Sequence, residues 1–277
     1  MHTLILNNED QTIRAEVVPE HGGMISQIWL HGREILHINR VTLETAPMAA
    51  GGIPILFPFS SRTKDDCYEL GGKTYYMPMH GLVKNDCFAI KSAADDKVVL
   101  WLENSPSWKV QNYPFDFHLE IEYQLKEDQL ATVFRITNKS EQAMPHYLGW
   151  HPFFKSTDKH RIQVKHDMQV HYDYQAHVDQ ELCALDDLSK EWDDVFHSPI
   201  NGGFLVENEA DQYQVQCETG EEFDALVVCS IVQESMCVEP WCGLPDSINT
   251  GRLLKWIQPG ETKEYTIRLK IKEKATI

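Results

Sequence analysis

The stretch FDFHLEIEYQL, residues 115–125, decides the fold class because its apolar and polar residues alternate without a break. Aromatic or aliphatic residues occupy every odd position, and charged, amide or imidazole side chains occupy every even one. A period of two with one apolar face is typical of a half-buried antiparallel strand. The sequence KED, residues 126–128, then reads as a turn into LATVFRIT, residues 130–137, and this order predicts a β-hairpin.

The same alternation recurs along the chain, and helical patterns are scarce. Further strands are expected in TIRAEVV (12–18), VVLWLE (98–103), YQVQC (213–217) and YTIRLKIK (265–272). The best helical candidate is ALDDLSKEW, residues 184–192, which would form only about two turns and be marginal alone. Many short strands separated by turns predict an all-β fold, a large antiparallel β-sandwich with little helix. Because no linker or repeat divides the chain, we expect a single domain over residues 1–277.

Composition narrows the class of partner. The 277 residues include 42 acidic and 25 basic side chains, a formal net charge of -17, and 42% are hydrophobic. Such a field repels nucleic acid and anionic membranes and favours a small neutral ligand. The N-terminal sequence lacks the pattern of a signal peptide, and no apolar run approaches the ~18 residues of a membrane span. The seven cysteines are odd in number and form no CxxC, so we expect reduced thiols and a cytoplasmic protein. We also expect a monomer or homodimer.

Four segments interrupt the strand pattern and carry the candidate functional residues. They are GGIPILFPFSSR (51–62) with Arg62, MPMHG (77–81) with His80, LGWHPFF (148–154) with His151, and CVEPWCGLPD (237–246) with Glu239 and Trp241. A glutamate between an apolar residue and Pro-Trp is expected to be partly desolvated, which raises its pKa toward that of a general base. Each residue also has a structural interpretation: a surface arginine, core histidines, or a glutamate paired with a buried arginine.

Metal and nucleotide chemistry find little support in the sequence. Among 13 histidines, His166, His171 and His177 fall in one strand-rich region, but no HxH or HExxH motif organises them. The spacing of Cys237 and Cys242 does not match a zinc ribbon, and neither GxGxxG nor a P-loop is present. We therefore expect no metal and no cofactor. The remaining histidines, carboxylate, arginine and aromatic residues suit acid–base chemistry on a sugar whose apolar face stacks on an aromatic ring.

Taken together, these motifs resemble the aldose 1-epimerase (galactose mutarotase-like) superfamily, in particular its bacterial branch of epimerase-related proteins. The resemblance extends over about 250 residues. It includes EHGGMI (20–25), the four segments above, YPFDF (113–117) and the PGE turn at residues 259–261.

This resemblance implies a β-supersandwich and a cofactor-free isomerase that interconverts the α and β anomers of a monosaccharide. By motif, Glu239 matches the base for the C1 hydroxyl and His151 the acid for the ring oxygen, across a ring-sized gap. His80 matches a second active-site histidine that holds and polarises the sugar. Arg62 and Asp194 match sugar-binding residues, with Asp193 adjacent to Asp194 in the divergent text WDDVF.

Three alternatives stay open at this stage. A hexose-6-phosphate mutarotase shares GGIP-like text, although the cations near the motifs are only Arg62, Lys64, Lys73 and Lys84. A non-catalytic carbohydrate-binding or sugar-sensing protein would have no need of an acid and a base. A glycosidase would use Glu239 and Asp194 as a carboxylate pair.

Overall fold

The computed structural model describes residues 2–45, 51–198 and 203–274, and antiparallel strands dominate these residues. The predicted hairpin is confirmed: β10 (Phe117–Lys126) pairs with β11 (Gln129–Asn138) in antiparallel register. Every odd residue of β10 is buried, as the alternation predicts. This face of the hairpin therefore contributes to the core.

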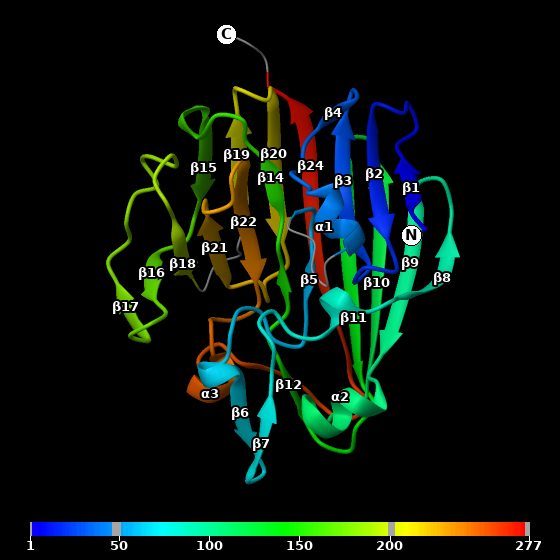
Figure 1. Ribbon diagram of the computed structural model, residues 1–277, viewed down its shortest axis with the longest axis vertical. Helices are drawn as coiled ribbons and strands as arrows, with labels where there is room; N and C mark the ends of the chain where they lie inside the picture. Colours follow the sequence, from blue (N-terminus) through cyan, green and yellow to red (C-terminus); the bar gives the residue numbers. More distant parts are fainter. Residues whose placement is uncertain (1, 46–50, 199–202, 275–277) are drawn as a thin grey trace.

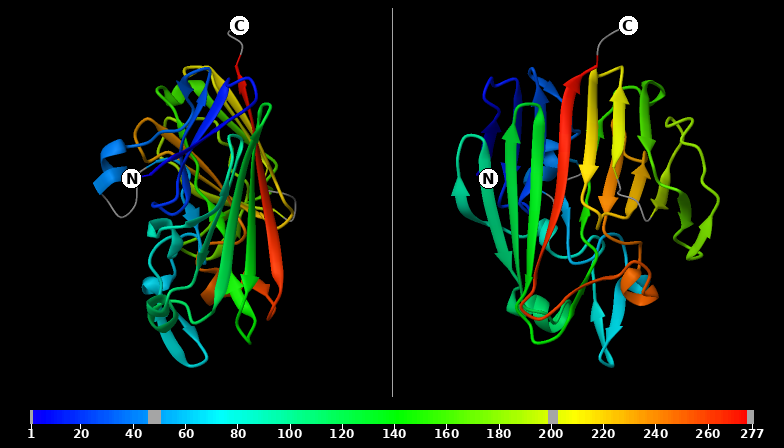
Figure 2. Two further views of the ribbon diagram at one scale, coloured as in Figure 1. Left: turned by 90° about the vertical axis from the view of Figure 1, so that its right-hand side faces the viewer. Right: turned by 180° about the vertical axis from the view of Figure 1, so that it is seen from behind.

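One layer of the fold is an eight-stranded antiparallel sheet that contains this hairpin. Its order is β15 (Ile162–His166), β19 (Phe204–Asn208), β20 (Tyr213–Thr219), β24 (Thr262–Glu273), β11, β10, β9 (Lys97–Glu103) and β8 (Ala89–Ala93). Three of the other predicted strands, in residues 98–103, 213–217 and 265–272, lie in this sheet. Seen from behind, the sheet forms the face nearest the viewer (Figure 2).

Two sheets side by side form the second layer. The first contains β1 (Leu4–Asn7), β2 (Ile13–Val18), β3 (Met24–Leu30) and β4 (Arg33–Glu34). The second follows the order β17 (Val178–Gln180), β16 (Val170–Asp173), β18 (Asp193–His197), β21 (Ala225–Cys229), β22 (Ser235–Trp241), β13 (Gly149–Trp150) and β5 (Ile55–Leu56), and β14 (Phe153–Lys155) also pairs with β22. Isolated bridges, Ile25 to Ile53 and Leu36 to Phe154, join the two sheets. The result is a large β-sandwich, as predicted.

Short elements close one end of the sandwich, at the bottom of Figure 1. They include the hairpin β6 (Cys67–Leu70) and β7 (Lys73–Tyr76), the pair β12 (Met144–His146) and β23 (Lys255–Ile257), and helices α2 (Pro106–Gln111) and α3 (Ser247–Thr250). Helix α1 (Arg40–Thr45) and the 3-10 turns η1 (Lys64–Asp66), η2 (Val83–Asn85) and η3 (Lys159–Arg161) complete the described structure. Among the described residues, no helix is long and apolar enough to cross a membrane.

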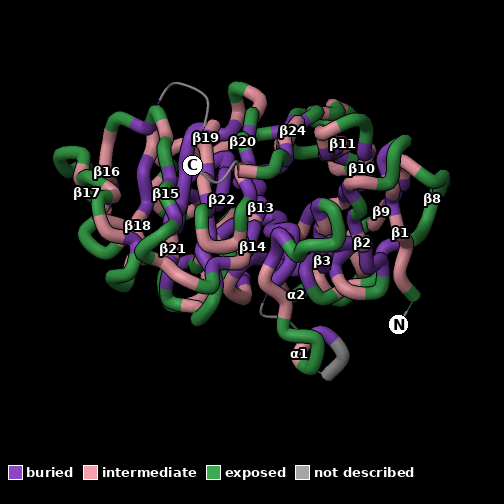
Figure 3. Tube along the Cα trace, turned by 90° about the horizontal axis from the view of Figure 1, so that it is seen from above, coloured by how far each residue is buried: buried purple, intermediate pink, exposed green. Residues whose placement is uncertain are grey.

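Burial follows the strand pattern, with one informative exception. The main cluster of buried apolar residues runs from Leu6 to Ile271 and includes residues of both layers, whereas the edge strands β8 and β17 are exposed (Figure 3). Glu120 belongs to the polar face of β10 and is nevertheless buried. The ammonium group of Lys91 and the guanidinium of Arg135 cover it at 2.5 and 3.1 Å, so its charge is paired.

The helix predicted for residues 184–192 is wrong. These residues form a turn and irregular backbone. The Asp187 carboxylate accepts hydrogen bonds from the backbone N–H and the hydroxyl of Ser189, and the indole N–H of Trp192 donates to the Asp187 carbonyl. Short polar side chains that bond the nearby backbone compete with the helical hydrogen bonds.

Candidate active site

Strand β22 provides the floor of the candidate site. All seven of its residues are buried because it lies between β21 and the β13–β14 segment. Its alternation directs Cys237, Glu239 and Trp241 to one face. Glu239 and Trp241 line a cavity of about 470 Å³ above this face.

Segments far apart in the sequence surround this cavity. Strands β18, β21 and β22 form one side, and the loops before η1, after β7 and before α3 form the rim. Figure 1 shows β22 running toward α3 and the β6–β7 hairpin, where these loops gather. The described lining residues are Ser61, Arg62, Thr63, Lys64, Met79, His80, His151, Tyr174, His177, Asp193, Val195, Val227, Cys229, Ile231, Val232, Glu239, Trp241, Pro245 and Asp246.

His151 and Glu239 are in direct contact within the cavity. His151 Nε2 lies 3.2 Å from Glu239 Oε1, so the expected ring-sized gap between the two groups is wrong. The imidazole stacks on the ring of Phe153, with centroids 4.3 Å apart and planes 8° from parallel. The other carboxylate oxygen of Glu239 accepts a hydrogen bond from the indole N–H of Trp241 at 3.2 Å. Both reactive groups are thus held in fixed orientations.

Burial controls the charge of this pair. Loss of solvent raises the pKa of Glu239 well above its usual range, since its side chain is only 2% exposed. Burial also lowers the pKa of His151 to about 3. Both shifts favour the neutral forms. The pair is therefore a neutral carboxyl beside a neutral imidazole, in contact through Glu239 Oε1 and His151 Nε2.

His80 completes a cluster of acid–base groups. Its ring lies edge-on to that of His151, with centroids 5.4 Å apart, and 6.2 Å from Trp241. Its Nδ1 accepts a hydrogen bond from the backbone N–H of Ser61 at 3.1 Å, so the neutral ring carries its proton on Nε2. Burial is the largest cause that lowers the pKa of His80 well below its usual value, and the nearby ammonium group of Lys84 lowers it further. His80 is therefore a neutral hydrogen-bond donor.

A comparison with known proteins adds to this geometry. The sequence model of the aldose 1-epimerase family matches residues 4–270. The chain belongs to this family.

Individual relatives of this aldose 1-epimerase family member are distant. The chromosomal protein LacX of Lactococcus lactis subsp. lactis is 27% identical over 110 residues. These residues cover 38% of this chain and 36% of LacX, so the match spans about a third of the length of this relative.

Solved structures share the fold over nearly the whole chain. Slr1438 from Synechocystis sp. PCC 6803 superimposes with a TM-score of 0.91 at 24% identity, covering 99% of this chain and 96% of that one. A putative aldose 1-epimerase from Escherichia coli K12 has a TM-score of 0.81 at 18% identity, covering 98% and 99%. At these identities the likeness establishes the fold alone.

The two aspartates of β18 lie on opposite faces of the strand. Asp193 lines the cavity, and its carboxylate accepts a hydrogen bond from the Tyr174 hydroxyl at 3.1 Å. Asp194, the residue predicted to bind sugar, lies outside the lining and contacts His171 Nε2 at 2.7 Å. Of the two candidates, Asp193 therefore lines the cavity and Asp194 does not, and sugar binding by either aspartate stays a prediction. The pairing of β18 with β21, in which Asp193 is opposite Cys229, determines which aspartate faces the cavity.

Of the four basic residues considered for binding a sugar phosphate, only two line the cavity. Arg62 and Lys64 line the cavity, and the Arg62 side chain is 64% exposed at 3.3 Å from Asp66. Lys73 instead donates to the carbonyl of Val110. Lys84 is buried, and its ammonium group donates to the carbonyl of Met79, directly before His80.

Sequence reasoning missed several residues of the cavity. Asp246 lies in the quoted segment 237–246, and its carboxylate accepts hydrogen bonds from the Lys64 backbone N–H and the Asn249 amide. His177 also lines the cavity, and its Nδ1 contacts the Tyr172 hydroxyl at 3.1 Å. In the sequence, the proximity of His177 to His166 and His171 pointed only to the metal-site hypothesis, not to this cavity. The signal for Asp246 was a polar residue in a loop that already contained Glu239.

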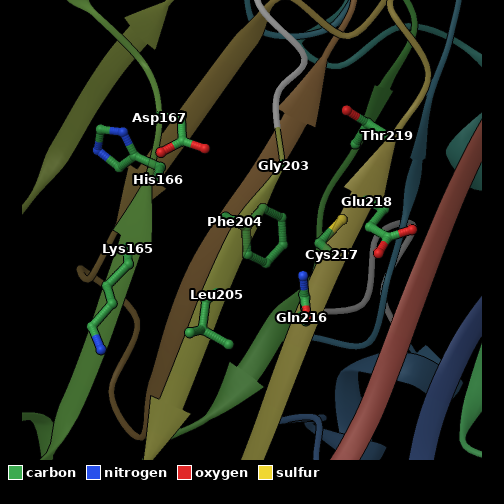
Figure 4. Close-up of a pocket in the computed structure, with 10 residues that line it drawn as sticks. All are labelled: Lys165, His166, Asp167, Gly203, Phe204, Leu205, Gln216, Cys217, Glu218 and Thr219. Carbon is green, nitrogen blue, oxygen red and sulfur yellow. The ribbon is translucent and has the colours of Figure 1, made fainter.

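A second cavity of about 560 Å³ lies across β15, β19 and β20 (Figure 4). Two of its polar side chains already have partners. Lys165 pairs with Glu207 at 2.5 Å, and His166 Nδ1 accepts from the backbone N–H of Met168. Its lining includes Lys165, His166, Asp167, Gly203, Phe204, Leu205, Gln216, Cys217, Glu218 and Thr219. The acid–base contact of His151 with Glu239 makes the first cavity the candidate active site.

Proposed function

We propose that this chain is a mutarotase that interconverts the α and β anomers of a monosaccharide in the cavity above β22. The observation that carries the proposal is the contact of His151 Nε2 with Glu239 Oε1 at 3.2 Å. Family membership supports a mutarotase-like reaction. The proposal assigns Glu239 as general base, His151 as general acid and His80 as a hydrogen-bond donor to the sugar.

The chemistry of ring opening accounts for two adjacent groups. The C1 hydroxyl loses a proton while the ring oxygen gains one, and both oxygens are bonded to the same carbon. Glu239 takes the hydroxyl proton as the C1–O bond of the ring breaks and the carbonyl forms, and His151 Nε2 gives its proton to the ring oxygen. Rotation about C1–C2 followed by the reverse steps yields the other anomer. Touching side chains therefore suit these oxygens better than groups separated by a whole ring.

The protonation states can be reconciled with these roles. A neutral carboxyl with a neutral imidazole holds the same number of protons as a carboxylate with an imidazolium. Transfer of one proton along the 3.2 Å contact converts the resting pair into the reactive one. The indole N–H of Trp241 on Glu239 Oε2 stabilises the carboxylate. Sugar hydroxyls that enter the cavity would add further hydrogen bonds to it.

The rest of the cavity suits a polar ring with one apolar face. Trp241 supplies an aromatic surface, and Val195 and Val227 add apolar walls. Asp193 and Asp246 supply carboxylates for hydroxyl groups. Arg62 and Lys64 at the rim are the cations that a phosphorylated sugar would use, so sugar phosphates belong in the test.

Exchange NMR on the equilibrated anomers of glucose, galactose and glucose 6-phosphate tests the proposal. We expect the wild-type protein to accelerate exchange of at least one sugar. His151→Gln, purified in the same way, should lose most of this acceleration and thereby exclude a contaminating host enzyme. The matched variant His160→Gln changes an exposed histidine outside the cavity and should retain it. Saturable sugar binding without acceleration would instead indicate a sugar-binding protein and contradict the proposal.

A further inference from the structure

The floor of the candidate active site contains a cluster of metal-ligating atoms. One nitrogen of His151, the sulfur of Cys237 and a carboxylate oxygen of Glu239 lie within 4.8 Å of one another. Cys237 precedes Glu239 by two residues on β22, so both side chains lie on the same face. The thiol has no role in the proposed anomer exchange.

A second thiol lies beside this cluster. Cys229 on β21 is directly opposite Cys237 in the antiparallel register, so the two side chains lie on the same face of the sheet. Cys229 also lines the cavity together with His151 and Glu239. The cavity therefore gives a hydrated ion a route to His151, Cys229 and Glu239, and the buried Cys237 lies beside Cys229 and Glu239. Both cysteines are free thiols.

We propose that Cys237, Glu239 and His151, assisted by Cys229, bind a thiophilic divalent cation of the zinc class. Thiolate, imidazole and carboxylate are the ligands that zinc takes in proteins. Tetrahedral zinc places such ligand atoms about 3.5 Å apart, given its usual bond lengths. His151 Nε2 and Glu239 Oε1 are already 3.2 Å apart, and the Cys237 sulfur lies within 4.8 Å of the ligand atoms of both residues, so the sulfur must approach them when an ion binds.

Charge and proton balance agree with this site. The ion displaces the protons of the Cys237 thiol and the Glu239 carboxyl, which pass to solvent, and it compensates the charges that remain. The formal net charge of -17 attracts cations to the molecule. A bound ion would occupy both His151 and Glu239. Zinc should therefore inhibit mutarotation, and only this consequence rests on the proposed function.

Zinc binding to the metal-free full-length protein, kept reduced, tests the inference directly. Competition with a chromophoric chelator measures affinity and stoichiometry, and Co²⁺ substitution reveals thiolate ligation through its charge-transfer absorption. We expect one ion per chain with thiolate absorption. Cys237→Ser should weaken zinc binding at least about tenfold and remove much of this absorption. Cys217→Ser changes a buried thiol on β20 in the other layer and should bind zinc like the wild type.

The outcomes separate this inference from the proposed function. Equal zinc affinity of wild type and Cys237→Ser, or cobalt binding without thiolate absorption, would overturn the inference. Because Cys237→Ser alters a buried position, Glu239→Gln provides a second, nearly isosteric variant, and it should also weaken zinc binding. Zinc binding with thiolate absorption in a protein that does not exchange anomers would support the inference and reject the mutarotase proposal. Rapid anomer exchange without zinc binding would support the mutarotase proposal and overturn the zinc inference.

Discussion

At the scale of single residues, Asp193 and Asp194 point to opposite faces of β18. Asp193 lines the cavity and Asp194 contacts His171, so substitutions at the two positions test where the sugar binds. We expect Asp193→Asn to weaken sugar binding about tenfold or more, because a hydrogen bond to a charged group contributes about 1.5–3 kcal/mol. Asp194→Asn is the matched control, since Asp194 lies outside the cavity lining and contacts His171. Isothermal titration calorimetry with the sugar found active in the NMR assay measures both effects. A larger loss of affinity in Asp194→Asn would contradict the structural assignment.

The sequence could not choose between these aspartates. Both occur in the text WDDVF, and alternation alone predicts only that they face opposite sides. Which side is the cavity depends on the pairing of β18 with β21, more than thirty positions later in the chain. Glu239, His151, Arg62 and His80 are easier to find because each lies in a segment where proline, glycine or aromatic residues interrupt the strand pattern.

At the scale of elements, the loop after β7 positions His80 through Gly81. Gly81 has φ +78°, and an added Cβ would lie 2.3 Å from the carbonyl oxygen of Phe57. We expect Gly81→Ala to lower the free energy of unfolding by more than about 2 kcal/mol, since backbone strain and a steric clash act together. Urea unfolding measures this change. The same substitution should also reduce anomer exchange, because His80 is the preceding residue.

Gly72 provides the matched control for this prediction. It has a similar φ of +75°, in the turn between β6 and β7, but an added Cβ would meet nothing within 4 Å. Gly72→Ala should therefore cost only about 1 kcal/mol, the penalty of the left-handed backbone alone. Equal losses in the two variants would show that the close approach of Gly81 to Phe57 is unimportant.

Local patterns predicted strands better than helices for a physical reason. In FDFHLEIEYQL, the alternation of apolar and polar residues alone predicts both a strand and the face of that strand that is buried. The helix expected at residues 184–192 depended on a weak pattern, which the hydrogen bonds of Asp187 with Ser189 and Trp192 override. Helix α2 was overlooked, although Ser105 caps it and Pro106 begins it, as is typical of helix starts.

At the scale of the whole molecule, buried neutral histidines make stability depend on pH. His146 is fully buried with its Nε2 2.6 Å from the Tyr265 hydroxyl, and burial lowers its pKa to about 3. Between pH 6.5 and 3 the unfolded chain binds a proton at this residue and the folded chain does not. The free energy of unfolding therefore falls as the pH falls, by up to about 1.4 kcal/mol per pH unit from His146.

Urea unfolding of His146→Gln between pH 6 and 4 isolates this contribution. The variant lacks the titrating group, so its stability should fall less steeply with decreasing pH than that of the wild type. Its stability at pH 7 is expected to be lower, because the hydrogen bond with Tyr265 changes. Parallel pH profiles would contradict the assignment of a buried neutral imidazole.

The whole fold also explains why the site could be predicted only in part. His80, His151 and Glu239 come from three distant segments, and only the assembled sandwich brings their rings and carboxyl together. The prediction that these three residues share one site came from the family resemblance. The direct contact between His151 and Glu239 needed the register of β22 with its neighbours.

The central claim is that the Glu239 carboxylate removes the proton that starts ring opening. Exchange NMR on Glu239→Gln, next to the wild type and the exposed control Glu141→Gln, tests it most directly. We predict a loss of about 10²–10⁴ in the exchange rate for Glu239→Gln, typical of a removed general base. Sugar binding should remain measurable by calorimetry, and Glu141→Gln should exchange like the wild type. Wild-type exchange in a correctly folded Glu239→Gln protein would contradict the claim.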